Sequence, residues 1–492
     1  MALTKSSFIR GYQCPKMLWM DANLPEAADN LIINEDFAAM GNTVGDLAKG
    51  YFGKFVEVPF SHNKKKMHTK TMDLMEAGIT NICQASFSWN GNFCNVDILR
   101  CFEDHVDIVE VKSSIKVSDV FLYDMAYQYL ILTQCGLKVE HVYNLHLNKD
   151  YVRKGKLSIK KLFELTDCTE EVIKRRQFVK EKIREINKTV KSQEEPEVEL
   201  SESCSMPYDC VYWNYCSRKL PKPNLFDVHG MQKNKQFDLY RDGVISFQQL
   251  AEAPAGVSES QLQQVLFELE NRPPYVDKKA IGEFLNTLSY PLYYLDFEAY
   301  NPPIPEFDGV SPYMQVPFQY SLHVQKTEGG PLEHYEFLGK EGEDPRRALA
   351  EHLVADIPKD VCLLAYNNTF EESVISKLAG QFPDLSEHLM NIHGGIKDLM
   401  VPFRNHSYYC KAMNGSYSIK YVLPAMCPDD PELDYHRLDG VHNGAEASAT
   451  FRDMCGFSEE EVIKSRENLL KYCGLDTYAM VKIVEKLYKL VK

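Results

Sequence analysis

The chain has 492 residues, of which 44% are hydrophobic and 25% are charged, and its formal net charge is −15. This length predicts about two to four domains, each large enough to bury its own core. The composition is that of an ordinary globular protein and excludes the disordered and fibrous classes. The best candidate for a membrane span, 121–137, contains Asp124, Gln128 and Gln134, so we expect no membrane-spanning segment.

The N-terminus lacks the apolar core of a signal peptide, and we therefore expect a cytoplasmic protein. In that compartment the 14 cysteines are reduced thiols or metal ligands rather than disulfides. Residues 1–222 hold equal numbers of acidic and basic side chains, so the whole of the −15 falls in residues 223–492. Basic side chains recur along 174–191, which reads as a helix whose cations either line a phosphate backbone or simply face solvent.

Two short strands are predicted at 95–99 and 106–112, and they read as an antiparallel pair. Glu110 and Lys112 are two residues apart and therefore share a face, and Asp97 can meet them across the hairpin. A divalent ion on Asp97 and Glu110, with Lys112 beside the attacking water, would be a minimal apparatus for phosphodiester cleavage. An acidic hairpin with a pairing lysine is the commoner explanation of such a pattern.

An acidic segment at 192–199 contains a proline and predicts an exposed link. It is followed by the evenly spaced Cys204, Cys210 and Cys216, which stand among aromatic residues. Three neighbouring thiolates require a fourth ligand and a metal centre, and Cys14 is the best candidate because it has a similar aromatic context. By spacing alone, Zn²⁺ and an iron–sulfur cluster are equally favoured, because the familiar C-x-x-C step is missing.

Residues 221–274 contain short helical patterns, with Ser258 as the N-cap of one of them, and predict a helical connector. The next unit starts near Tyr275 and soon reaches Asp296 and Glu298, which lie in a run rich in aromatic and apolar residues. Residues i and i+2 of a strand project from the same face, and adjacent carboxylates repel each other unless a cation lies between them. The pair therefore predicts half of a divalent-metal site, although an acidic strand face is common by chance.

Further acidic candidates follow along the chain. Glu371 stands in the first turn of a predicted helix, directly after an apolar strand at 361–366, where it can face Asp296. Residues 459–492 read as a pair of terminal helices in which Tyr472 and Asp476 are four residues apart and share a face.

These motifs resemble those of the ribonuclease-H-like 3′–5′ exonucleases of the DEDD class, which have Asp-x-Glu on the first strand, Asn-x-x-Phe-(Asp/Glu) entering a helix and Tyr-x-x-x-Asp on a late helix. The resemblance implies a mixed sheet with flanking helices and a two-metal mechanism with Mg²⁺ or Mn²⁺. It implies that Tyr472 orients or activates the attacking water and that the metal ligands are Asp296, Glu298, Glu371 and Asp476.

One position departs from this family, because Glu371 stands where the broader class has Asp. Asp398, in an apolar run, would be an accessory carboxylate. Turn and cap chemistry explains four nearby polar residues better than substrate positioning does; these are Asn367, Asn368, Ser416 and Lys420.

The first half, with its flanking cysteines, resembles the PD-(D/E)xK nucleases of the RecB type that close on a four-cysteine [4Fe–4S] cluster, as in the CRISPR-associated iron–sulfur exonucleases. The resemblance implies a restriction-endonuclease-like fold and favours the cluster over Zn²⁺. It implies metal ligands at Asp97 and Glu110 with Lys112 beside them, and it implies the cluster ligands Cys14, Cys204, Cys210 and Cys216.

This half departs further from its family. Gln84 stands where related proteins often have a glutamate, and the usual Gln-x-x-x-Tyr motif is replaced by a segment from Asp124 to Gln128. His68 would be the upstream histidine that some members use, although a lone histidine is more often incidental.

We therefore expect an α/β multidomain protein with a PD-(D/E)xK nuclease-like domain at 1–222, a helical connector at 223–274 and a ribonuclease-H-like domain at 275–492. The whole chain is similar to a family of bacterial proteins that fuse these two modules. The predicted function is metal-dependent hydrolysis of phosphodiester bonds at single-stranded ends of DNA or RNA. One alternative is a nucleic-acid-binding or complex-assembly protein with a structural cluster and an inactive N-terminal nuclease fold. Another is an RNA-processing exoribonuclease.

Overall fold

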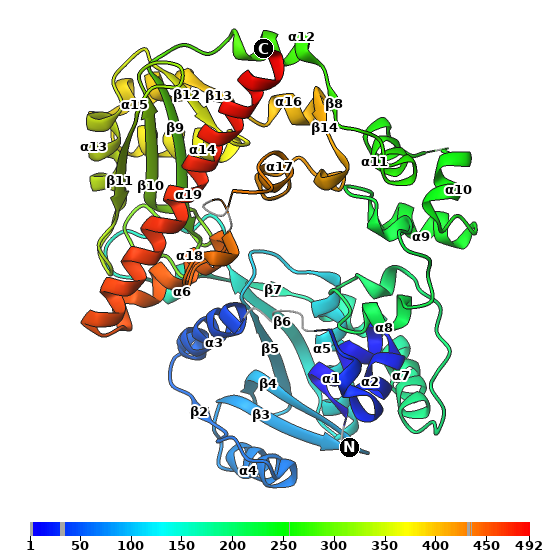
Figure 1. Cartoon of the computed structure of the whole chain (residues 1–492). Coiled ribbons are helices and arrows are strands. Elements are labelled where there is room, and N and C mark those ends of the chain that lie inside the picture. Colours follow the sequence, from blue (N-terminus) through cyan, green and yellow to red (C-terminus); the bar gives the residue numbers. More distant parts are fainter. Residues whose placement is uncertain (1–2, 30–34, 255, 431–432, 434) are drawn as a thin grey trace. The chain divides into compact units, whose positions relative to one another are not determined.

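The protein is an α/β multidomain protein with mixed sheets, as predicted (Figure 1). The structure is a computed structural model that describes residues 3–29, 35–254, 256–430, 433 and 435–492. One compact unit consists of Met1–Leu220 and Pro302–Met314, and the other consists of Pro221–Asn301 and Gln315–Lys492. Within the described ranges, none of the helices is both long and apolar enough to cross a bilayer.

The first unit is built on a seven-stranded sheet. Its strands are β1 (Leu3–Thr4), β2 (Val56–Glu57), β3 (Asn81–Trp89), β4 (Asn92–Cys101), β5 (Val106–Lys112), β6 (Val139–Leu147) and β7 (Phe163–Asp167). They lie in the order β2-β3-β4-β5-β6-β7, and β1 pairs with β4. The predicted antiparallel pairing of β4 with β5 is confirmed, and β6 lies parallel to β5. The β3–β4 turn holds Asn90 and Gly91, both with positive φ, the pair that a type I′ hairpin turn favours.

Helices pack on both faces of this sheet. One core contains side chains from α1 (Lys5–Gln13), α4 (Lys64–Glu76), α5 (Asp119–Gln134) and α7 (Thr169–Val190). On the opposite face, Val44 of α3 (Glu35–Ala48) packs in a core with Ile98 and Val109. Helix α5 is the crossover that two neighbouring parallel strands, here β5 and β6, require.

A segment distant in sequence completes the first unit. Residues 302–314 follow β9 (Leu292–Tyr300) of the second unit and join the first. Arg153 Nη1 donates to the carbonyl oxygen of Pro305 at 2.9 Å, and the Tyr313 hydroxyl donates to the carbonyl oxygen of Ser113 at 2.8 Å. This excursion therefore places Tyr313 directly beyond the end of β5.

The second unit is built on a five-stranded sheet in the order β11-β10-β9-β12-β13. In addition to β9, its strands are β10 (Val316–Gln325), β11 (Leu332–Leu338), β12 (Cys362–Ala365) and β13 (Ile396–Asp398). β10 is antiparallel to both β9 and β11, whereas β12 runs parallel to both β9 and β13. The predicted strand at 361–366 is thereby confirmed.

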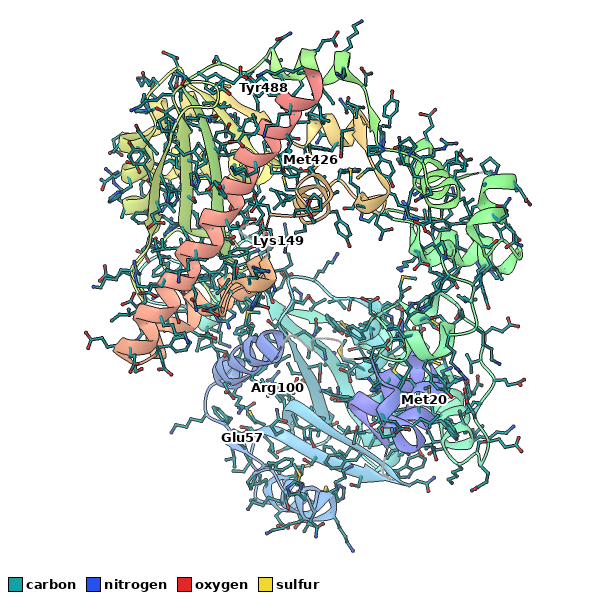
Figure 2. All side chains as sticks on the ribbon, viewed as in Figure 1. Met20, Glu57, Arg100, Lys149, Met426 and Tyr488 are labelled. Atoms are coloured by element: carbon teal, nitrogen blue, oxygen red, sulfur yellow. The ribbon has the colours of Figure 1, made fainter. Side chains whose placement is uncertain are left out.

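Alternate residues of β9 face different helices. Tyr293, Leu295 and Phe297 share a core with α13 (Arg346–Asp356), α14 (Thr369–Gln381) and α15 (Ser386–Gly395). Leu292 and Tyr294 instead share a core with α12 (Lys278–Leu285), α17 (Ile419–Met426) and α19 (Glu459–Val491). In Figure 2, Met426 marks α17 and Tyr488 marks the last turns of α19. By the same alternation, Asp296 and Glu298 lie on the α19 face.

The C-terminal segment is one helix of 33 residues, so the prediction of two terminal helices is wrong. It begins at a capping box in which Ser458 and Glu461 bond each other's backbone N–H groups. Gly474 does not interrupt it, because one glycine costs a helix only about 1 kcal/mol, less than packing on β9 and β10 returns. Gln319 of β10 fixes the position of α19 by donating to the carbonyl oxygen of Leu469 at 2.8 Å.

The predicted connector is helical, with α9 (Lys233–Arg241), α10 (Phe247–Glu252) and α11 (Glu259–Glu270). Ser258 caps α11 as predicted, and Gln261 completes a capping box. By its contacts this segment belongs to the second unit. The predicted link at 192–199 has no helix or strand and is largely exposed.

Candidate metal centre

Three predicted carboxylates meet on the α19 face of the second sheet. Asp296 and Glu298 project from β9, and Asp476 projects from α19. One oxygen atom from each of the three lies within 4.8 Å of the other two. Glu298 is only 8% exposed. Hard divalent cations such as Mg²⁺ take carboxylate oxygens as ligands, so the donor set fits such an ion.

Burial and repulsion between the carboxylates dominate the electrostatics of this cluster. Burial and the neighbouring carboxylates, Asp476 first, raise the pKa of Asp296 well above its ordinary value. Burial and Asp476 raise the pKa of Glu298 to about 8. Burial raises the pKa of Asp476 to about 6. A divalent cation would favour the ionised forms and remove the repulsion.

Glu371 lies in the first turn of α14, as predicted, and is 2% exposed. Its Oε2 atom has no hydrogen-bond partner in the described structure. Burial and nearby carboxylates raise its pKa to about 8, and Glu371 in turn raises the pKa of Asp296. Glu371 stands outside the group of three, but its buried oxygen without a partner suits a metal ligand.

Asp398, at the end of β13, has partners for both carboxylate oxygens. Its Oδ1 atom accepts from the backbone N–H groups of Asn367 and Met400, each at 2.9 Å, and its Oδ2 atom pairs with Arg404 at 2.9 Å. Asn367 has a φ of +64°, a backbone conformation that asparagine tolerates better than most residues. Asp398 therefore holds the turn that carries Glu371 into α14, which is the role of a positioning residue.

Two tyrosines contact Asp476. Tyr472 lies one turn earlier on α19 and is buried, and its hydrogen bond lowers the pKa of Asp476. The Tyr435 hydroxyl donates to Asp476 Oδ1 at 2.6 Å. Sequence reasoning missed Tyr435, because it lies in a short 3₁₀ turn (Tyr435–Arg437) with no fixed spacing from the other residues.

Buried polar side chains hold α19 in place beside Asp476. The Thr477 hydroxyl lies 2.7 Å from the Ser321 hydroxyl and 2.8 Å from His323 Nδ1. Cys473 Sγ lies 3.6 Å from Asp296 Oδ2. These contacts fix both helix and strand, so the carboxylates are positioned by rigid elements.

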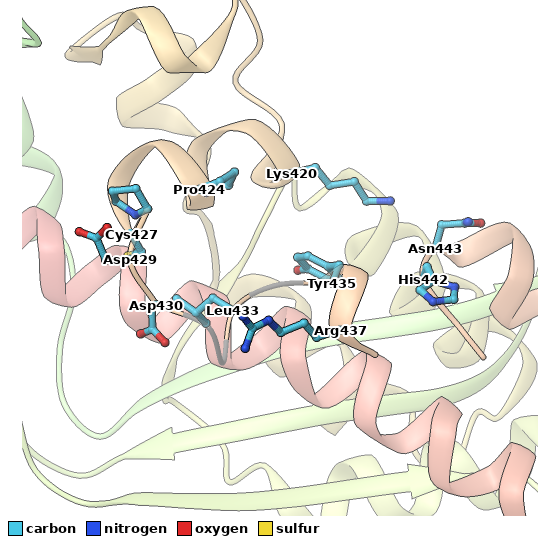
Figure 3. A pocket seen from close by; sticks show the side chains of 11 residues that line it. Lys420, Pro424, Cys427, Asp429, Asp430, Leu433, Tyr435, Arg437, His442 and Asn443 are labelled. Atoms are coloured by element: carbon cyan, nitrogen blue, oxygen red, sulfur yellow. The ribbon is translucent and has the colours of Figure 1, made fainter. Parts of the chain in front are cut away.

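A pocket of about 650 Å³ opens beside this cluster (Figure 3). Tyr435, which donates to Asp476 of the cluster, lines this pocket together with Lys420, Arg437 and His442. The Lys420 charge lowers the pKa of both Glu298 and Asp476. Lys420, which turn chemistry was expected to explain, thus belongs to the surroundings of the carboxylates. Ser416 does make a turn contact, accepting from the backbone N–H of Ser418 at 3.2 Å.

The predicted residues of the first unit also lie together. Glu110 and Lys112 share the α5 face of β5, and Lys112 Nζ lies 2.8 Å from Glu110 Oε1 and 2.6 Å from Asp124 Oδ2. Gln128, one turn beyond Asp124 on α5, donates to Glu110 Oε2 at 2.8 Å. The Asp124–Gln128 segment, noted as a departure from the family motif, therefore contacts the site through both of its end residues.

Asp97 lies opposite this pair on β4. Its Oδ2 atom accepts from the backbone N–H of Val111 at 2.9 Å, and its Oδ1 atom accepts from Gln84 Nε2 at 3.4 Å. Burial and the Glu110 charge raise its pKa to about 6. His68 accepts from the backbone N–H of Ser88 at 3.3 Å, a contact with the edge of the sheet rather than with these carboxylates.

The four predicted cysteines gather at the other end of α1. Cys14 lies between α1 and α2 (Pro15–Asn23), Cys204 ends a 3₁₀ turn, and Cys216 lies in α8 (Trp213–Ser217). Cys14, Cys210 and Cys216 pack around the buried Met20, which Figure 2 labels. After burial, the charges of the other three cysteines contribute to the raised pKa of Cys210, which reaches about 12. All 14 cysteines are free thiols.

Hydrogen bonds fix the loop around these thiols. The Gln13 side chain, next to Cys14, donates to the carbonyl oxygens of Ser203 and Tyr208 at 2.8 and 2.6 Å. Trp19 Nε1 donates to the carbonyl oxygen of Ser192 at 3.0 Å. Four thiols gathered in one place suit either a [4Fe–4S] cluster or Zn²⁺.

A family model described as a domain of unknown function, DUF2779, matches residues 293–418. The matched stretch begins on β9, contains Asp296, Glu298 and Glu371, and ends before Asp476. Searches of curated proteins and of solved structures gave no match.

Proposed function

We propose that the protein is a metal-dependent nuclease and that its second unit is a 3′–5′ exonuclease of the ribonuclease-H-like DEDD class. The observation that carries the proposal is the group formed by Asp296, Glu298 and Asp476, whose oxygen atoms lie within 4.8 Å of one another on the face of a sheet. Buried carboxylates this close are costly unless they bind cations.

The topology of the second unit supports the proposal. Three antiparallel strands followed by two parallel ones, with the Asp-x-Glu motif on the central strand β9, agree with the arrangement that the resemblance implies. Glu371 enters from the strand-to-helix turn after β12, and Asp476 enters from the last helix. The three contexts are those predicted from the family motifs.

The roles follow from the contacts. Asp296, Glu298, Asp476 and Glu371 would hold Mg²⁺ or Mn²⁺, which would activate water and stabilise the leaving oxygen of a phosphodiester. Tyr435 holds Asp476 through its hydrogen bond. Tyr472 stands beside Asp476 with a pKa raised by burial and by the carboxylates, so its hydroxyl stays protonated. Its one hydrogen bonds Asp476, and its oxygen would orient the attacking water as an acceptor.

The neighbouring pocket would take the terminal nucleotide. Lys420, Arg437 and His442 give it side chains that can donate hydrogen bonds to a phosphate group, and Asp429 and Asp430 line the same pocket. The proposal covers both DNA and RNA, because these side chains do not distinguish a ribose 2′-hydroxyl from its absence in DNA.

For the first unit we infer a PD-(D/E)xK nuclease-like domain with a [4Fe–4S] cluster on Cys14, Cys204, Cys210 and Cys216. Support comes from the β3-β4-β5-α5-β6 succession, which brings Asp97, Glu110 and Lys112 together, and from the gathering of the four thiols. Iron and sulfide analysis of anaerobically purified protein distinguishes this cluster from Zn²⁺.

The test is digestion of single-stranded DNA and RNA, labelled at either end, with Mn²⁺. The wild type is compared with Asp296→Asn and with a matched control, Asp356→Asn. Asp356 lies on α13 of the same unit and accepts from the Tyr320 hydroxyl at 2.6 Å, as Asp476 does from Tyr435. We expect stepwise shortening from the 3′ end by the wild type and the control, and none by Asp296→Asn. Absence of hydrolysis by the wild type on every substrate would favour a binding or assembly protein.

A further inference from the structure

The carboxylate site of the first unit contains a cation that belongs to the chain itself. Lys5 Nζ lies 2.7 Å from Glu110 Oε1 and 4.0 Å from Asp124 Oδ2. Lys112 contacts the same oxygen of Glu110. Two ammonium groups thus share one carboxylate oxygen at a site where the family resemblance implies a divalent metal and a single lysine.

Lys5 reaches this site from a rigid support. It is the first residue of α1, whose N-cap Thr4 accepts from the backbone N–H of Ser7 at 3.2 Å. The carbonyl oxygen of Leu3, on β1, accepts from the Tyr127 hydroxyl at 2.6 Å, and Phe8 stacks on the Tyr127 ring with centroids 4.7 Å apart. The lysine is therefore held by the sheet, by α5 and by a capped helix.

Two ammonium groups of the chain face the three carboxylates of this site and offset most of their charge. Although burial disfavours its charged form, Asp124 and Glu110 raise the pKa of Lys5 well above its ordinary value. Burial also opposes ionisation of Glu110, but Lys112 and Lys5 lower its pKa below the ordinary value. The second unit differs, because in its described residues no ion pair is formed by Asp296, Glu298, Glu371 or Asp476.

We propose that the Lys5 ammonium is the resident cation of the Asp97–Glu110–Asp124 site and occupies the place of a divalent metal. A metal ion brought to Glu110 would meet two ammonium groups, which already offset most of the negative charge that would attract it. The first unit therefore does not bind Mg²⁺ or Mn²⁺ at this site while α1 is in place, and the nuclease-like fold serves another purpose than hydrolysis.

The test measures metal binding rather than activity. Equilibrium dialysis with Mn²⁺ uses full-length protein carrying Asp296→Asn and Asp476→Asn, so that the remaining bound metal reports the first unit. We expect no bound Mn²⁺ that depends on Glu110 in this background, and one Mn²⁺ per chain after Lys5→Met is added. The matched control is Lys16→Met, which removes another buried lysine of this unit, paired with Glu195 at 2.7 Å.

Two results would overturn the proposal. The first is one bound Mn²⁺ in the background protein that Glu110→Gln abolishes, a measurement that needs no change at Lys5. The second is a folded Lys5→Met protein, judged by circular dichroism, that gains no Mn²⁺. Both are independent of the exonuclease proposal, which is tested by hydrolysis in the second unit.

Discussion

The carboxylate cluster of the second unit should make the metal-free protein less stable than a variant that lacks one of its charges. The perturbation is Asp296→Asn, which keeps the shape of the side chain and removes its charge. Two full charges 4.8 Å apart repel by about 3.5 kcal/mol at an effective dielectric constant of about 20. Asp296 has two such neighbours, but partial protonation reduces the gain, because burial and the neighbouring carboxylates raise the pKa of Asp296 well above its ordinary value and that of Glu298 to about 8.

We therefore expect Asp296→Asn to stabilise the metal-free second unit by about 2–3 kcal/mol, which raises its Tm by roughly 5–10 °C. The assay is thermal unfolding in EDTA and in Mn²⁺. Mn²⁺ should raise the Tm of the wild type and leave that of Asp296→Asn nearly unchanged. The control Asp356→Asn should lose stability in EDTA, because it weakens the bond from Tyr320. A fall in Tm of Asp296→Asn in EDTA as large as that of the control would refute the reasoning.

Three further outcomes are expected. Tyr435→Phe should weaken Mn²⁺ binding about tenfold, because it removes a hydrogen bond to Asp476, a proposed metal ligand. The control Tyr320→Phe should leave the dissociation constant for Mn²⁺ unchanged. Equal dissociation constants for the two variants would contradict the role of Tyr435. Cys210→Ser should lose iron and become sensitive to proteolysis within 1–222 only, whereas Cys168→Ser should retain its iron. Loss of iron from both variants would contradict the assignment of the four predicted cysteines as the cluster ligands. Burial and His334 lower the pKa of His323 to about 4, so between that pH and about 6.5 the unfolded chain binds more protons than the folded chain, and the folded state loses stability on acidification. Urea unfolding at pH 7 and pH 5 should therefore show a smaller loss of stability for His323→Gln than for the wild type. Equal losses would exclude His323 as the origin of the pH dependence.

The two carboxylate sites contrast in how their charge is neutralised. In the second unit, Asp296, Glu298 and Asp476 form a carboxylate group for which we propose a divalent cation from solution. In the first unit, Lys5 and Lys112 supply positive charge from the chain. Similar acidic sequence patterns therefore lead to different local charge environments in the two units.

Parts of the second site were predictable because they depend on local periodicity. Asp296 and Glu298 share a face through the two-residue repeat of a strand, and Tyr472 and Asp476 share one through the four-residue spacing of a helix. The position of Glu371 followed from the helix that begins after an apolar strand. In each case a few neighbouring residues determine the geometry.

Other features depend on contacts between distant segments and were not predictable. Tyr435 reaches Asp476 from a separate turn, and Lys5 reaches Glu110 across 105 positions of the chain. The excursion at 302–314 joins the first unit through hydrogen bonds from side chains to backbone carbonyls that leave no motif. The single helix α19, predicted as two helices, likewise packs along its length on the distant strands β9 and β10.

Mn²⁺-dependent hydrolysis of end-labelled single-stranded DNA by the wild type, Asp296→Asn and Lys112→Met decides which unit holds the working centre. Asp296→Asn is expected to abolish hydrolysis, whereas Lys112→Met, in the first unit, is expected to leave it intact. Hydrolysis that survives in Asp296→Asn and disappears in Lys112→Met would contradict this expectation, because the first unit would then hold the working centre.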